Sequence, residues 1–335
     1  MSIDILKKFF NITPEKSFLE GNYVRYMHEN TLYTLIPVTT IQEEQLVEWY
    51  EMSEHLFAQG DRYVSRFVSS KDSKFLITVN DEDFCLLKNK YHSIPRKINH
   101  GRKLAKFHHR GRSLRTELQN VSRIGQWKSF WEKRLDQMEK VWYQNVQNHP
   151  DHEFEYLFID SFPYYMGLCE NAIQYLVDTE LDDTPQLIDA GTICHERFNK
   201  NTWGKNHWIR NPFDWVYDHA TRDLAEWIRD QYFRNKRTFL PDLQQFLRSY
   251  QSISPLSSFS WRLLYARLLF PLHYFECIEE YFVTGSEHRK ISLEEKLKQT
   301  LRDTEDYERF LGDFFQIAEI PSRGQNLPRV EWLNR

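Results

Sequence analysis

LIDAGTICHERFNKNTWGKNHWIRNPFDWVYDHATRDLAEWIR, residues 187–229, is the stretch that decides the fold. It opens with a short apolar run, Gly191 to Cys194, which is too short for a helix and suits a buried strand. A polar, Asn-rich loop follows His195, and a second short segment begins at Asp214. Asp223 then opens an amphipathic helix. The order is therefore strand, loop, strand, Asp and helix.

This order resembles the catalytic core of small-molecule kinases of the aminoglycoside-phosphotransferase and choline-kinase type. In that family the loop reads His-Gly-Asp-Phe-His-x-x-Asn, followed by Ile-Asp-Phe or Ile-Asp-Trp and then by Asp-Leu-Ala. The resemblance puts His195 at the loop His, Arg197 at the catalytic Asp, Thr202 at the metal-binding Asn, Asp214 at the metal-binding Asp and Asp223 at the start of the helix. The frame of the site is present, but two of its reactive residues are not.

Phosphoryl transfer needs a carboxylate that accepts or orients the hydroxyl proton, and an Asn and an Asp that hold magnesium. Arg197 cannot act as a base, because its guanidinium stays protonated. It also brings a positive charge toward the metal, and two unit charges ~4 Å apart at an effective dielectric of about 20 repel by roughly 4 kcal/mol. Thr202 is a poor replacement for a carboxamide ligand. We therefore expect no catalytic residue in the degenerate loop His195, Glu196, Arg197 and Thr202, and we expect Asp214 to be a vestigial metal ligand at most.

Three alternatives stay open. Glu196 and Asn201 keep the five-residue spacing of the family pattern, shifted back by one position. An unconventional small-molecule phosphotransferase could use Glu196 as base and Asp214 with Asn201 on magnesium, with ATP as donor, although a one-residue shift in an extended loop turns side chains to the other face. The second alternative is a nucleotide-sensing switch without transfer, and the third is an all-helical scaffold unrelated to kinases.

Composition limits the class of protein. The chain has 335 residues, enough for two lobes with a sizeable core, and 16% of them are aromatic. A net charge of −4 gives no case for nucleic acid as the main partner. The four Cys are far apart and indicate reduced, buried thiols. No apolar run reaches the ~18 residues of a membrane span, and the N-terminus shows no signal peptide.

The first part of the chain predicts a small N-lobe, residues 1–92, with an antiparallel sheet of about five strands and one packing helix. After a short helix at 3–10, strands are predicted at 23–27, 32–38, 63–68, 75–79 and 84–87, and a helix at 42–57. The five Glu of that helix are read as a solvated acidic face. The strand at 32–38 lacks the Lys, and the lone Gly21 lacks the Gly-rich loop, that kinase N-lobes carry. The resemblance places a hinge with the adenine site near residues 88–95.

The remainder, residues 93–335, predicts a larger, mostly helical C-lobe that carries the degenerate loop, so the fold class is α+β and kinase-like. Helices are predicted at 99–109, 125–144, 154–177 with an interruption near Pro163, 241–250, 259–282 with a kink at Pro271, and 293–320. The tail at 321–335 is expected on the surface. His108 and His109 are interpreted as capping or core-edge residues, His195 as a donor to backbone carbonyls, and Asp223 as an N-cap or a buried anchor of the loop.

Several blocks resemble one branch of this superfamily more closely, the spore coat proteins of the CotS group and its YutH type. The blocks are residues 32–38, 101–109, 193–198, 212–229 and 261–282. Membership implies synthesis in the mother-cell cytoplasm of a sporulating bacillus, location in the spore coat and other coat proteins as partners. With four kinase features missing, we expect a pseudokinase that acts as a structural or interaction component and needs no cofactor.

Overall fold

The computed structural model describes residues 2–21, 23–92, 98–204, 207–236, 238–320 and 327–333. The chain forms two compact units. The first contains Met1–Arg123, Ala190–Asp230 and Arg248–Ser254, and the second contains Ile124–Asp189, Gln231–Leu247 and Pro255–Arg335. The predicted boundary between an N-lobe and a C-lobe at residues 92 and 93 stays a prediction. The compact units are a different division, because they group the N-terminal sheet with residues 190–230.

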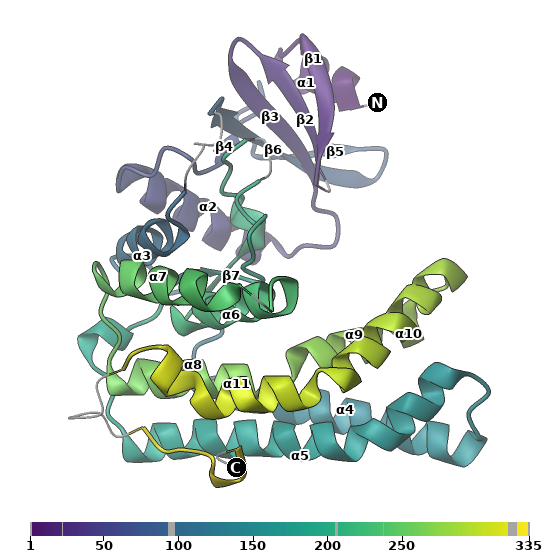
Figure 1. The fold of residues 1–335 in the computed structure, drawn as a ribbon. Helices are drawn as coiled ribbons and strands as arrows, with labels where there is room; N and C mark the ends of the chain where they lie inside the picture. The colour runs from purple at the N-terminus through teal and green to yellow at the C-terminus, as the bar shows by residue number, and fades with distance from the viewer. Residues whose placement is uncertain are drawn as a thin grey trace. The chain divides into compact units, whose positions relative to one another are not determined.

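The first unit begins with a six-stranded antiparallel sheet (Figure 1). Its strands are β1 (Lys16–Glu20), β2 (Tyr23–His28), β3 (Thr31–Pro37), β4 (Arg66–Val68), β5 (Leu76–Val79) and β6 (Glu82–Lys90). The order is β1-β2-β3-β6-β4, and β5 pairs with another part of β6. The sequence predicted about five strands. It missed β1, because this segment is short, mostly exposed and charged at both ends.

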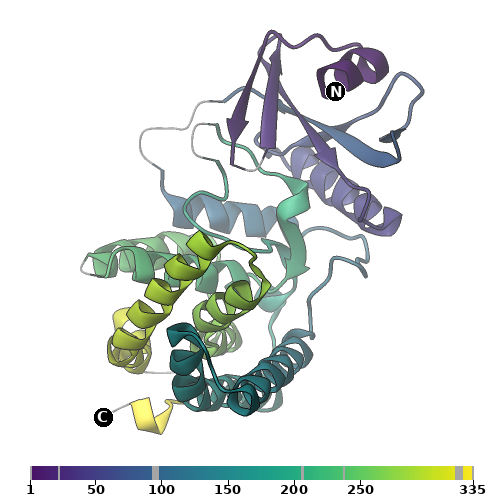
Figure 2. The same cartoon turned by 90° about the vertical axis from the view of Figure 1, so that its right-hand side faces the viewer.

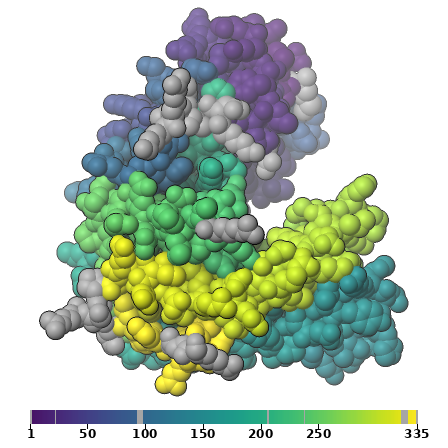
Figure 3. Space-filling view, viewed as in Figure 1, coloured from purple at the N-terminus to yellow at the C-terminus, as the bar shows by residue number. Residues whose placement is uncertain are grey.

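Two helices cover opposite faces of the sheet (Figure 2). Helix α1 (Ser2–Phe10) packs Leu6 against Tyr26 and Leu86. Helix α2 (Glu43–Ala58) packs Leu46 against Ile36, Phe67, Cys85 and Leu87. Because side chains alternate along a strand, neighbouring positions of β6 serve the two different cores. In the space-filling view, purple atoms of the N-terminal strands adjoin the blue atoms of the segments that follow (Figure 3).

A short hairpin carries the deciding stretch. Strands β7 (Thr192–His195) and β8 (Trp215–Asp218) pair antiparallel, and every residue of β7 is buried. Helix α3 (His100–Gly111) ends against β7, where a side chain on Gly111 would come within 2.7 Å of the Ile193 backbone nitrogen. Only glycine permits this close approach. Helix α6 (Thr221–Arg234) follows β8, so the predicted order of strand, loop, strand and helix is confirmed.

A buried ion pair joins the segment after α2 to the segment before β8. The Asp61 carboxylate accepts hydrogen bonds from Arg210 and, at 3.0 Å, from Arg110. The backbone nitrogen of Ser65 also donates to the Arg210 carbonyl at 2.9 Å. Burial lowers the pKa of the Arg210 guanidinium, and the charge of Asp61 opposes that shift. The charged pair therefore holds two distant parts of the chain together inside the first unit.

The second unit is helical. Its elements are α4 (Trp127–Asn148), α5 (Glu153–Asp182), part of α7 (Phe239–Gln251), α8 (Ser258–Leu269), α9 (Leu272–Val283), α10 (Glu287–Arg302) and α11 (Thr304–Ile317). Short 3-10 turns lie at Leu187–Asp189 and Glu331–Leu333. The antiparallel N-terminal sheet and the larger, mostly helical C-terminal part confirm the predicted α+β class.

The predicted interruption near Pro163 is wrong. Helix α5 continues through Pro163. Pro163 has no backbone N–H, so the Ile159 carbonyl lacks its helical partner. The Trp142 indole N–H donates to that carbonyl at 3.0 Å and replaces the missing hydrogen bond. Two other boundaries also differ. The chain breaks completely at Phe270 and Pro271 between α8 and α9, and Asp303 separates α10 from α11 where one helix was predicted.

Parts of two predictions lie outside the described residues: 93–95 of the hinge, and 321–326 with 334–335 of the tail. All four Cys are free and buried, as predicted. Among the helices that the structure describes, none combines the length and apolarity that crossing a membrane requires.

Asp61→Asn should lower the free energy of unfolding by about 3–5 kcal/mol, because Arg210 would then be a buried charge without a full counter-charge. Urea denaturation measures this. The matched control, Asp72→Asn in an exposed turn, should change stability by no more than about 0.5 kcal/mol. Equal effects of the two substitutions would contradict the role given to the buried pair.

Candidate site around the degenerate kinase loop

The β7–β8 hairpin sets the geometry of the loop. His195, the last residue of β7, lies opposite Trp215, the first residue of β8. The backbone nitrogen of Glu196 donates to the Asp214 carbonyl at 2.8 Å, so pairing extends one residue beyond the strands. The two ends of the loop, one leading to Arg197 and the other to Asp214, are thereby held side by side.

A buried polar network fixes this hairpin to α6 and α3. The Asp223 carboxylate accepts the His195 backbone N–H at 2.9 Å and contacts His195 Nδ1 at 2.7 Å and His108 Nε2 at 3.1 Å. The Trp203 indole donates to His195 Nε2 at 3.0 Å, which makes Nδ1–H the donor to Asp223. The Tyr250 hydroxyl lies 2.8 Å from His108 Nδ1. His195 therefore bonds a carboxylate and an indole, and not the backbone carbonyls that were predicted.

Burial and charge act in opposite directions in this network. Burial raises the pKa of Asp223, but contacts with His195 and His108 outweigh it and hold the pKa well below its usual range. Burial lowers the pKa of His108, and the hydrogen bond to Asp223 opposes that shift only in part. Asp223 is thus the predicted buried anchor, whereas His108 is a fully buried network member and not a cap or core-edge residue.

His108, Cys194 and Asp223 present three potential metal-ligand atoms within 4.8 Å of one another. The carboxylate is already bound by two His, and the Cys194 thiol lies 3.4 Å from the His219 carbonyl oxygen. All three side chains are completely buried. Protein hydrogen bonds therefore account for this group without a metal ion.

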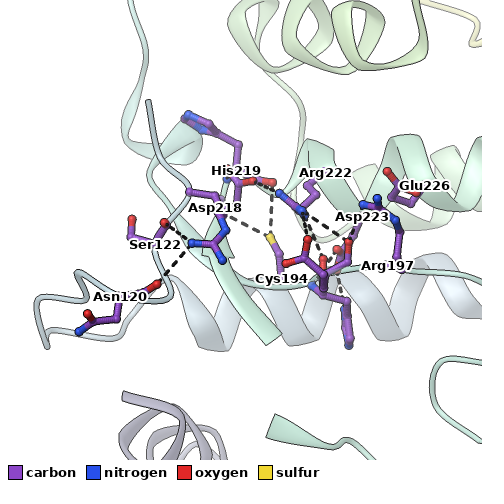
Figure 4. Close-up of polar contacts among 12 residues, drawn as sticks. Asn120, Ser122, Cys194, Arg197, Asp218, His219, Arg222, Asp223 and Glu226 are labelled. Carbon is purple, nitrogen blue, oxygen red and sulfur yellow. Dashed lines mark hydrogen bonds and ion pairs between the residues drawn. The ribbon is translucent and has the colours of Figure 1, made fainter. Parts of the chain in front are cut away.

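Glu196, the base of the rescue alternative, is held by an arginine. Arg222 donates to its carboxylate at 3.0 Å, to the Asp218 carboxylate at 2.7 Å and to the His195 carbonyl at 3.1 Å. Figure 4 shows Arg222 reaching from α6 toward Asp218. The Glu196 side chain is half exposed, so water still reaches it. Its carboxylate nevertheless serves as a partner of Arg222.

Thr202 closes the loop on itself. Its hydroxyl accepts the Asn199 backbone N–H at 2.8 Å and donates to the Arg197 carbonyl at 3.2 Å. Arg197 is exposed, and its guanidinium donates to the Glu196 carbonyl at 3.2 Å. At the two positions where the family pattern requires a base and a metal ligand, the side chains thus bond to the loop backbone.

A cavity of about 550 Å³ lies beside the loop, within the first unit. Its lining includes Arg25 from β2, Glu196, Arg197, Thr202 and Asp214. Burial raises the pKa of Asp214, and His195, Arg25 and a hydrogen bond with Asn211 act against this. Two guanidinium groups line the space next to the one carboxylate expected to hold metal. The lining also includes Glu20, Asn199, Asn201 and Asn211, so oxygen donors and guanidinium groups line the same space.

The α2 carboxylate expected on a solvated face is buried instead. Glu48 accepts backbone N–H groups from Gln119, Asn120 and Val121 at 2.8–3.1 Å. Burial raises its pKa, and these amide hydrogen bonds outweigh burial and lower it. In active kinases such a helix Glu pairs with the strand Lys. Here it anchors the backbone of residues 119–121.

Aromatic side chains lie where the resemblance places the adenine-binding hinge. The Trp208 backbone N–H donates to the His92 carbonyl at 3.2 Å, and the Trp208 ring is nearly fully buried. It packs against Tyr63 and Trp203, with ring centroids 5.6 and 5.5 Å away. A hinge carbonyl that could bind an adenine is thus taken by the chain itself.

The end of β1 is bonded to the same segment. The Glu20 carboxylate contacts His207 Nδ1 at 3.0 Å and accepts the His207 backbone N–H at 3.1 Å. Phe18 places its ring 5.0 Å from that of His207. In the kinase pattern the loop that follows this strand covers the phosphates of the nucleotide. Here the last residue of the strand binds the segment that follows the degenerate loop.

Sequence reasoning placed Glu196, Arg197, Thr202 and Asp214 around one space, and the structure brings them together. Sequence reasoning missed Arg25, Glu48 and Trp208. A charged residue inside the alternating apolar strand β2 is the signal that could have found Arg25. Glu48 and Trp208 gave no such signal, since their partners are backbone groups remote in sequence.

A sequence model of the family described as "Spore coat putative kinase YutH" matches residues 3–314. The endospore coat-associated protein YutH of Bacillus subtilis (strain 168) is 44% identical over 319 residues, covering 95% of this chain and 94% of that protein. The chain belongs to the Spore coat YutH family. The resemblance to the YutH type is confirmed, while the wider CotS grouping stays a prediction.

Solved phosphotransferases share the fold of this YutH family member. An aminoglycoside phosphotransferase from Alicyclobacillus acidocaldarius superposes with a TM-score of 0.69 at 14% identity, over 91% of this chain and 93% of that one. A spectinomycin phosphotransferase bound to ADP and spectinomycin gives 0.59 at 12% identity, over 89% and 93% of the two chains. At these identities the likeness establishes the fold alone.

His108→Gln should flatten the dependence of stability on pH. A His whose folded pKa is lowered loses stability as the pH falls through its unfolded pKa of about 6.5, and this loss is at most about 1.4 kcal/mol at pH 5.5. Urea denaturation at pH 7.5 and 5.5 measures it. The free energy of unfolding should fall between the two pH values in the wild type and should fall less in His108→Gln.

The control for this experiment is His152→Gln, at an exposed position. It should retain the full pH dependence of the wild type. Identical pH dependence in His108→Gln and the wild type would contradict a neutral, buried His108.

Proposed function

We propose that this protein is a kinase-fold component of the bacterial endospore coat that does not transfer phosphate. The observation that carries the proposal is Arg197 at the position of the catalytic carboxylate, in a loop that its own side chains hold closed. A guanidinium cannot accept the proton of an attacking hydroxyl, and it opposes a metal ion beside Asp214.

Three further contacts support the same conclusion. Glu48 accepts backbone amides, the His92 carbonyl accepts the Trp208 backbone N–H, and Glu20 at the end of β1 binds His207. Each contact involves a position that an active kinase uses to bind ATP or to support the loop over the ATP phosphates. Together they give a rigid framework suited to binding other coat proteins.

Location follows from the family. The YutH protein of Bacillus subtilis is described as endospore coat-associated, and we extend that location to this chain, with other coat proteins as its partners. A fluorescent fusion in a sporulating bacillus should collect around the developing spore. A fusion that stays diffuse in the mother cell throughout sporulation would contradict the assignment.

One observation favours a second candidate, an unconventional phosphotransferase. Glu196 and Asp214 line the same cavity of about 550 Å³, so a base and one metal ligand could meet a substrate there. This candidate requires ATP and magnesium. It also requires Glu196 to leave Arg222 when substrate binds.

Conversion of ATP to ADP, measured with a set of small hydroxyl compounds present as acceptors, distinguishes the two candidates. The wild type, Glu196→Gln and the exposed control Glu44→Gln should all give the background rate with magnesium present. Arg197→Asp combined with Thr202→Asn should not create robust activity, because the His92 carbonyl still accepts the Trp208 backbone N–H and β3 contains no Lys. A magnesium-dependent wild-type rate that only Glu196→Gln abolishes would establish the phosphotransferase instead.

Thermal melts with ATP, ADP or GTP, each with and without magnesium, test nucleotide binding directly. We expect no change in melting temperature at millimolar nucleotide, whereas binding at 100 times Kd would add about 2.7 kcal/mol of stability. A shift that needs magnesium and disappears in Asp214→Asn would mean that Asp214 holds metal. A shift independent of magnesium would support a nucleotide-sensing switch.

A further inference from the structure

A second groove, separate from the loop cavity, lies beside β3, β6, β4 and the end of α2. Its volume is about 730 Å³, and none of its lining residues belongs to the cavity around Arg197. Four of the lining residues are Arg62, Arg66, Lys88 and Lys90, and the one acidic lining residue is Glu29. All of these residues belong to the first unit, so the groove is complete within it.

The register of the sheet puts like charges beside one another. Lys88 of β6 lies opposite Arg66 of β4 on one side and opposite Tyr33 of β3 on the other. Lys90, two residues along β6, points to the same face and lies opposite Thr31. Like charges directly across two strands destabilise a sheet. An anion is already present on one side of this row, because Glu54 binds Arg66, and Lys88 and Lys90 extend the positive charge beyond that ion pair.

An aromatic ring orders two of the cations. The Arg62 guanidinium lies 4.8 Å and the Arg66 guanidinium 4.3 Å from the centroid of the Phe57 ring. Glu54 binds Arg66 through two hydrogen bonds of 2.8 and 2.7 Å, so one of the four charges is neutralised in place. Within the described residues, no carboxylate forms an ion pair with the other three. Arg62, Lys88 and Lys90 are exposed.

The positive charge at this groove is opposite in sign to the net charge of the whole chain. The protein carries −4 overall, yet three cations that have no acidic partner among the described residues meet at one groove. His92 lines the same groove, and its Nε2 is shielded from water and has no partner among the described residues. A buried polar atom of this kind is normally satisfied by a hydrogen bond, which a ligand group could supply.

We propose that this groove binds an acidic segment of another polypeptide. Carboxylates of the segment would contact Lys88, Lys90 and Arg62, and an apolar side chain could pack on Tyr33 and Phe57. A volume of about 730 Å³ accommodates a few residues of an extended chain. A protein of a family associated with the endospore coat is surrounded by other coat proteins, which is why we choose a polypeptide as the occupant. The inference does not depend on whether the loop cavity has lost its activity.

The test measures the fluorescence anisotropy of a labelled peptide of eight Glu residues, with a peptide of eight Gln residues as the uncharged probe. The wild-type protein should bind the Glu peptide with a Kd in the micromolar range at low salt, and more weakly at 0.15 M salt, as screening requires. It should not bind the Gln peptide. Lys88→Glu combined with Lys90→Glu should weaken binding at least tenfold.

The matched control is Lys133→Glu combined with Lys140→Glu, which reverses two exposed charges on α4 and should bind the Glu peptide as the wild type does. Circular-dichroism melts should show that both double variants are folded. No binding by the wild type at millimolar peptide, or equal loss in both variants, would overturn the proposal.

Two further results would assign a different occupant and so overturn it as well. Tighter binding of an RNA oligonucleotide with the same number of charges would identify the groove as a nucleic-acid site. A wild-type dimer that only the Lys88→Glu and Lys90→Glu substitutions dissociate, seen by light scattering, would show that a second copy of this chain occupies the groove.

Discussion

The arrangement of the loop region depends on one buried carboxylate. Asp223 begins α6 and binds the backbone and ring of His195 and the ring of His108. Three separate parts of the chain, α3, β7 and α6, therefore meet at a single charge without exposure to water. Its contacts with the two His compensate for burial, and Trp203 and Tyr250 hold the outer nitrogens of both rings. The β7–β8 hairpin and the loop between its strands take their positions from this network.

On this framework the positions that the kinase pattern uses for chemistry make structural contacts. Thr202 bonds the loop backbone, Arg222 holds Glu196, and Glu48 holds the amides of residues 119–121. The protein has the kinase architecture. These structural contacts support the proposed role, in which the protein presents its surfaces to other coat proteins.

The sequence predicted the fold class, the order of the deciding stretch and the gathering of Glu196, Arg197 and Asp214, because these follow from local patterns and from a recognisable family frame. Prediction from sequence failed where a contact with a residue distant in the sequence determines the local structure. Pro163 lies inside a continuous helix because a tryptophan from α4 reaches the carbonyl it frees. Glu48 looked solvated because its partners are backbone amides some seventy positions away. No local pattern contains such information.

The bonds of Thr202 also limit which side chains this position can hold. Its hydroxyl both accepts from Asn199 and donates to Arg197, two roles that an asparagine would have to fill with a longer and differently shaped group. An asparagine at this position would therefore have to disturb the turn before its carboxamide could reach the neighbouring cavity. Substitution of this one residue is coupled in this way to the backbone conformation of the whole loop.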